Sequence, residues 1–89
     1  MILPDIDSRI IAQYGKEADA ARNILSEFSS KPGASPRVIR CILYLAAGDI
    51  RKLREYRETA EQDPRDVIYW AENRKDGERL RDFNEPFPK

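Results

Sequence analysis

The sequence predicts a small all-α domain built from four main helices. Apolar residues recur at spacings of three and four between Ile10 and Phe28, which is the period of one helix face. Pairs of residues that typically begin or end helices then divide Ser35 to Asn73 into three short helices. A chain of 89 residues has room for one domain, so these helices are expected to share one core.

The first helix is predicted to begin at Asp7 or Ser8, because either side chain can accept a hydrogen bond from free N–H groups at a helix start. One helix face carries all the apolar residues that recur in this stretch. They are Ile10, Tyr14, Ala18, Ala21, Leu25 and Phe28. Gly15 lies inside this stripe and costs about 1 kcal/mol relative to Ala. Since the stripe keeps its phase across Gly15, one long helix is favoured, and a break at Tyr14-Gly15 is the alternative.

The second helix is predicted to be the central and most buried element. A Ser/Lys/Pro/Gly connection over residues 29–34 lets the chain reverse, after which Ser35 caps a helix whose first position is Pro36. Apolar residues occupy most of its circumference. They are Val38, Ile39, Cys41, Ile42, Leu43, Leu45 and Ala46. Cys41 is the only cysteine, and we expect it to be a buried, inert thiol.

The third and fourth helices follow across two further stop and start signals. Gly48-Asp49 ends one helix and begins the next, so the second and third helices are expected to be antiparallel neighbours. The residues expected to face inward on the third helix are Ile50, Leu53, Tyr56 and Ala60. Asp63-Pro64 begins the fourth helix, on which Val67, Trp70 and Ala71 are expected to face inward and Tyr69 outward.

Domain organisation follows from where the pattern stops. Residues 1–74 are predicted to form the helical domain, and residues 75–89 a charged C-terminal segment that is partly disordered. Within that segment, Leu80 and Phe83 are the residues that could anchor a short helix over residues 78–83 against the body.

Composition excludes several classes of function. Sixteen basic and sixteen acidic residues cancel, which removes the bulk electrostatic argument for coating nucleic acid or an anionic membrane. The chain has no histidine, the commonest general base and metal ligand, and no motif for a metal or cofactor. The sequence therefore predicts a protein that is not an enzyme, with no catalytic, cofactor-binding or metal-binding residues. Without a membrane-spanning segment or a signal peptide, it is expected to be cytoplasmic.

Two surfaces remain as candidates for interaction. Arg37, Arg40 and Tyr44 are expected to share the narrow exposed face of the second helix, with Arg51 nearby on the third. This basic strip could bind nucleic acid. The alternative is a solvated edge whose arginines pair with acidic residues of another helix. Tyr69 is expected to be exposed among charged residues, an arrangement that is common in protein interfaces and also on plain surfaces.

The first functional interpretation is a non-enzymatic protein-protein interaction module or adaptor, whose partner is another protein or a second copy in a homodimer. The alternative is a nucleic-acid-associated regulator that uses the basic strip.

The stretch SPRVIRCILYLAAGDIRKLREYRETAEQDPRDVIYWAE, residues 35–72, resembles short bacterial hypothetical proteins of unknown function. The resemblance lies in its Pro-Arg-x-x-Arg-Cys-Ile-Leu start, its Gly-Asp turn and its Asp-x-Arg-Asp-Val-Ile-Tyr-Trp-Ala-Glu ending. It implies a bacterial or phage origin and a small helical fold, and it carries no functional residues with it.

Overall fold

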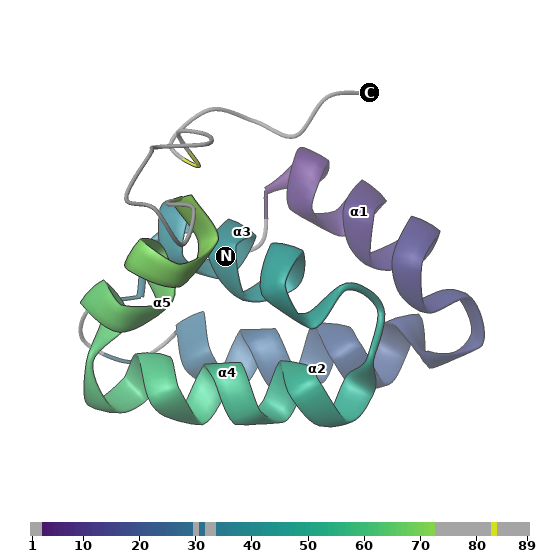
Figure 1. The fold of residues 1–89 in the computed structure, drawn as a ribbon. Coiled ribbons are helices and arrows are strands. Elements are labelled where there is room, and N and C mark those ends of the chain that lie inside the picture. The colour runs from purple at the N-terminus through teal and green to yellow at the C-terminus, as the bar shows by residue number, and fades with distance from the viewer. Residues whose placement is uncertain (1–2, 30, 32–33, 73–82, 84–89) are drawn as a thin grey trace.

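The computed structural model confirms the all-α fold. It describes residues 3–29, 31, 34–72 and 83, and Figure 1 shows their arrangement. The described elements are, in chain order, α1 (Pro4–Tyr14), a 3-10 turn (Gly15–Glu17), α2 (Ala18–Ser29), α3 (Pro36–Ala46), α4 (Ile50–Gln62) and α5 (Pro64–Glu72). The helix expected over residues 78–83 and the disorder expected in residues 75–89 lie outside the described residues, apart from Phe83.

The single long first helix is wrong, and the alternative break at Tyr14-Gly15 is confirmed. Gly15 has φ +47° and ψ −110°, a conformation that ends α1. The chain doubles back there, as Figure 1 shows. Arg22 Nε lies 2.8 Å from Asp7 Oδ1, whereas fifteen residues of continuous helix would span about 22 Å. Periodicity missed the break because the apolar residues on both sides still face one core.

The first helix also begins earlier than predicted. α1 starts at Pro4, with Leu3 in the capping position and no side chain accepting from the free N–H groups. Proline suits the first helical position because its φ is already helical and it has no N–H to satisfy. Asp5 and Asp7 both lie in the first turn, where carboxylates interact favourably with the helix dipole.

The predicted starts of the later helices are confirmed by hydrogen bonds. Ser35 Oγ accepts from the Val38 N–H at 3.3 Å. Asp49 Oδ1 accepts from the N–H groups of Arg51 and Lys52 at 2.9 and 3.2 Å. Asp63 does the same at the start of α5, where the Arg65 N–H donates to its Oδ1 at 3.0 Å. These bonds satisfy donors that the helices themselves leave free.

The turn between α3 and α4 packs closely against the first helix. Ala47 and Gly48 both have positive φ, of 50° and 88°. A Cβ atom at Gly48 would lie 3.2 Å from the backbone oxygen of Gln13. Glycine is therefore required here both for the backbone conformation and for the approach of α1.

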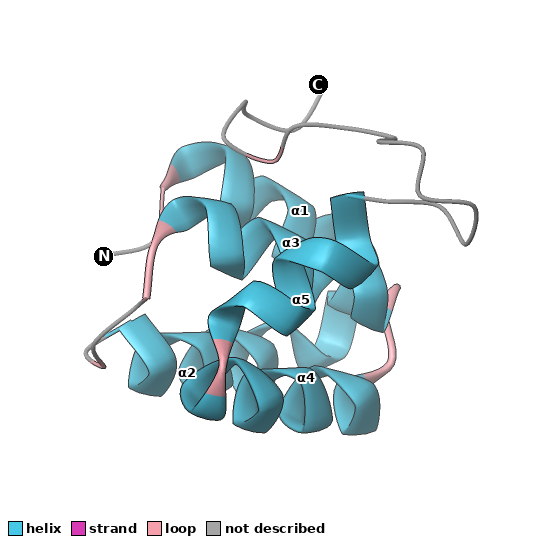
Figure 2. Ribbon diagram, turned by 60° about the vertical axis from the view of Figure 1, so that its left-hand side comes forward, coloured by secondary structure: helices cyan, strands magenta, loops and turns pink. Residues whose placement is uncertain are grey.

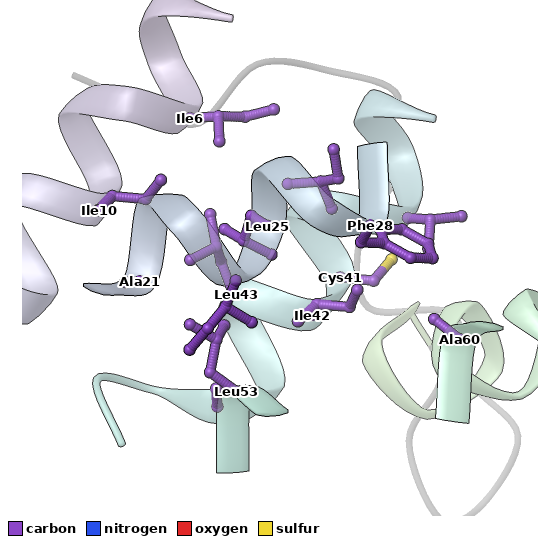
Figure 3. Close-up of a cluster of buried hydrophobic side chains, with 14 of the residues drawn as sticks. Ile6, Ile10, Ala21, Leu25, Phe28, Cys41, Ile42, Leu43, Leu53 and Ala60 are labelled. Carbon is purple, nitrogen blue, oxygen red and sulfur yellow. The ribbon is translucent and has the colours of Figure 1, made fainter. Parts of the chain in front are cut away.

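The core is centred on α3, as predicted. α3 packs against α1, α4 and α5, and Cys41, Ile42 and Leu43 on it are fully buried. Figure 3 shows how side chains from several helices meet in this cluster. Those that the figure labels are Ile6, Ile10, Ala21, Leu25, Phe28, Cys41, Ile42, Leu43, Leu53 and Ala60.

The inward position predicted for Trp70 is wrong. Val67 and Ala71 are buried as expected, but Trp70 is 48% exposed. Glu72 is buried instead. Successive residues of a helix are about 100° apart around its axis. The buried face of α5 therefore runs from Val67 through Ala71 to Glu72, and Trp70 lies about 130° from the centre of that face. The buried face of α5 is rotated toward Glu72 because this carboxylate has a partner on α3.

Candidate functional site

The five candidate interaction residues do not form one strip. Arg37, Arg40 and Tyr44 lie on α3, whereas Arg51 lies at the start of α4 and Tyr69 on α5. Arg51, Tyr44 and Tyr69 are exposed. Arg40 is only 3% exposed, so its predicted place on an exposed face is wrong. The alternative was a solvated edge paired with acidic residues of another helix. Both α3 arginines do pair with acidic residues of other helices, but Arg40 is buried and does not lie on a solvated edge.

Arg40 connects α3 to α1 and to the C-terminal part of the chain. Its Nε donates to Asp5 Oδ2 at 2.9 Å, and its Nη2 donates to Asp5 Oδ1 at 3.1 Å. Its Nη1 donates to the backbone oxygen of Phe83 at 3.1 Å. This two-pronged geometry matches a planar guanidinium to a planar carboxylate, which lysine could not reproduce.

Arg37 connects α3 to α5 in the same way. Its Nε and Nη2 donate to the two oxygens of Glu72 at 2.8 and 2.6 Å. Glu72 is 2% exposed, so this pair keeps a buried charge compensated. Glu72 also accepts a hydrogen bond from the Phe83 N–H at 3.1 Å. It does so through Oε2, the oxygen that accepts from Arg37 Nε.

Phe83 occupies the position where these two ion pairs meet. Its side chain is fully buried, and its ring centroid lies 5.1 Å from that of Tyr44, with an interplanar angle of 51°. Phe83 therefore does pack against the body, whereas Leu80 and the short helix that the two residues could anchor lie outside the described residues. We call the surrounding residues the Phe83 site: Asp5, Arg37, Arg40, Tyr44 and Glu72.

Sequence reasoning missed two members of the Phe83 site. Asp5 reads as a helix-start carboxylate, and nothing in the local pattern distinguishes Glu72 from a solvated residue. The burial of Arg40 could have been inferred from the sequence, because Arg40 lies between Ile39 and Cys41 on a helix that is apolar around most of its circumference. A charged residue in that position is rarely buried without a partner.

A second feature is an aromatic cluster on the outer face of α4 and α5. Tyr69 is 58% exposed, in agreement with the prediction, and Trp70 is 48% exposed. Tyr56 on α4 is half-buried and meets Trp70 edge to face, with ring centroids 6.3 Å apart. In Figure 2, α5 lies at the front, between α3 and α4. We call Tyr56, Tyr69 and Trp70 the aromatic patch.

Charges of both signs flank the aromatic patch. Asp66 lies one helical turn before Tyr69 and Trp70, and Arg65 one turn before Tyr69; both are exposed. Arg65 Nε also donates to Asp63 Oδ1 at 3.1 Å. Its guanidinium holds the pKa of Asp63 below the ordinary value.

Two features of the described residues bear on metal and small-molecule binding. No three carboxylate or thiol side chains among them lie close enough together to hold a metal ion. A hollow of about 260 Å³ lies where α2 and α3 connect, and its described lining carries no charge. The lining residues are Leu3, Ser29, Ala34, Ser35, Pro36 and Ile39. No described helix is long and apolar enough to cross a membrane.

Comparisons with known proteins add no family to this picture. The chain matches no protein-family model, and no curated protein or solved structure was found to be similar to it.

Proposed function

We propose that this protein is a non-enzymatic protein-protein interaction module that binds through the aromatic patch, and that the partner is a second copy of the chain. The supporting observation is that its only tryptophan is half exposed beside an exposed tyrosine. Tryptophan and tyrosine dominate the binding energy of protein interfaces because each supplies a large contact area and a polar atom.

Burial of the aromatic patch in a dimer would add substantially to the stability of so small a domain. Removing an aromatic side chain from water contributes about 1.5–3 kcal/mol. Domains of this size bury only about two thirds of their unfolded surface, so dimerisation is a common source of added stability.

The charges around the patch suit contact between two copies. In a two-fold dimer the same surface meets itself, so both signs of charge must be present for attraction. Arg65 and Asp66 provide both signs next to the aromatics, and the formal net charge of zero means that two copies do not repel each other.

The test uses Trp70 as its own reporter, since it is the only tryptophan in the chain. Tryptophan emission and light scattering are measured over a dilution series at low and high salt, with nuclease-treated protein. A dimer should form on concentration, with a blue shift of the emission as Trp70 leaves water. Trp70→Ala should abolish the dimer. Ile11→Ala is the matched control, because Ile11 is equally exposed on α1.

A wild-type protein that stays monomeric at high concentration, or a dimer that Trp70→Ala leaves intact, would remove self-association through the patch. Capture of a different protein that depends on Trp70 would support an adaptor in place of the homodimer.

Nucleic-acid binding is the second candidate, now moved from α3 to the start of α4. Arg51, Lys52 and Arg54 are exposed, and none of them forms an ion pair with a described residue. Their free charges could contact phosphates. Salt-sensitive binding of duplex DNA or RNA that weakens in an Arg51→Ala/Arg54→Ala variant would support this function. Binding unchanged by both substitutions would reject it.

A further inference from the structure

We infer that the Phe83 site is a peptide-recognition site for a phenylalanine-bearing segment of another polypeptide, and that the chain's own Phe83 occupies it in this structure. This inference concerns a surface of α3 and α5 that the proposed self-association does not use.

The contacts to Phe83 are those by which a protein recognises a linear peptide. Glu72 accepts from its backbone N–H, and Arg40 donates to its backbone oxygen, both at 3.1 Å. Its ring is buried and packs against Tyr44. Side chains therefore bind main-chain groups that every residue possesses, while the ring position selects an aromatic residue. Peptide-binding domains combine affinity from main-chain hydrogen bonds with selectivity from a side-chain pocket in this way.

The polar groups of the site are also held by bonds that do not include Phe83. Arg40 is held by two hydrogen bonds to Asp5, and Glu72 is held by two from Arg37. None of these four bonds involves Phe83. The donor and the acceptor should therefore stay in position when Phe83 leaves, and such preorganisation lowers the cost of binding a new segment.

The occupant also competes with any outside segment. Phe83 follows Glu72, a wall of the site, by eleven residues. Because Phe83 belongs to the same chain as the site, its binding there is intramolecular and is governed by an effective concentration, not by the protein concentration. An outside peptide must displace it, so its apparent affinity is reduced by the fraction of time that the site is occupied. Removing Phe83 should unmask the site.

The test uses the full chain with Phe83→Ala and Phe87→Ala, the second change removing a nearby phenylalanine that could take the vacated place. The probe is a fluorescein-labelled peptide of residues 78–85, which contains Phe83 as its only phenylalanine. The fluorescence anisotropy of the probe should rise when this variant is added, because the probe binds to it. Binding should be weaker by about tenfold or more for a probe with Phe83→Ala, because burial of a phenylalanine ring is lost.

Two further proteins are compared in the same binding assay. Wild-type protein should bind the intact probe more weakly than the unmasked variant, because its own Phe83 competes. Tyr44→Ala, added to the unmasked variant, should weaken binding without unfolding the protein, since Tyr44 is 45% exposed.

Three results would overturn the inference. An unmasked variant that is unfolded by circular dichroism shows that Phe83 is a required core residue and not an exchangeable occupant. A folded variant that leaves the probe free at millimolar concentration contradicts a peptide site. Equal binding of the intact and Phe83→Ala probes contradicts selection of the aromatic ring.

Discussion

Gly15→Ala should destabilise the protein, although glycine within a predicted helix usually favours the opposite change. Gly15 has φ +47° and ψ −110°, and a side chain in such a sparsely populated conformation costs about 1–3 kcal/mol. No neighbouring atom lies within 4 Å of the position a Cβ would take, so backbone strain is the whole cost. Alanine also restricts the unfolded chain, which returns about 0.4–1 kcal/mol. The net expectation is a loss of unfolding free energy of about 1 kcal/mol, within a range of about 0–2.6 kcal/mol.

The assay is urea denaturation followed by circular dichroism at the helix band, comparing wild type with Gly15→Ala. A continuous helix would instead gain about 1 kcal/mol from the same substitution, so the sign of the change separates the two structures. Ala20→Gly serves as the control, because Ala20 is exposed within α2 and the change should cost about 1 kcal/mol. Stabilisation by Gly15→Ala would refute the reasoning and restore the single long helix.

Three further predictions concern single side chains and are measured by urea denaturation. Arg40→Leu should cost about 3–5 kcal/mol because it breaks a buried, bidentate ion pair with Asp5 by removing one of its members. The double change Asp5→Leu/Arg40→Leu should recover much of this, and a single-variant loss below about 1 kcal/mol would contradict the role of the pair. Asp49→Ala should lower the unfolding free energy by about 1 kcal/mol and Asp49→Asn by much less, since Asp49 caps α4. Equal losses in the two variants would contradict the capping role of Asp49. Burial raises the pKa of Tyr14 to about 12 from an ordinary 10.0. The folded state therefore keeps a proton that the unfolded state releases, and wild type should lose about 2 kcal/mol of unfolding free energy relative to Tyr14→Phe between pH 10 and pH 12. Parallel pH profiles for those two proteins would contradict the shift.

The candidate surfaces illustrate why residue pattern alone places charged and aromatic side chains poorly. Arg40 and Tyr69 were both expected to be exposed, and only Tyr69 is. The difference arises because Asp5, thirty-five residues away, reaches Arg40 from α1. Trp70 was expected to be buried, but the inward position on α5 is taken by Glu72, whose charge is compensated by Arg37. Each outcome depends on a partner that is distant in the sequence.

The sequence by itself determined the all-α fold, the central position of α3 and the starts of α3, α4 and α5. These features depend on local physics, namely the period of the apolar residues and hydrogen bonds that span two or three residues. Tertiary structure decided the break at Gly15, the rotation of α5 and the assembly of the Phe83 site. Those features depend on which helices meet, because packing selects among conformations that local preferences leave close in energy, and because buried charges require partners from other helices.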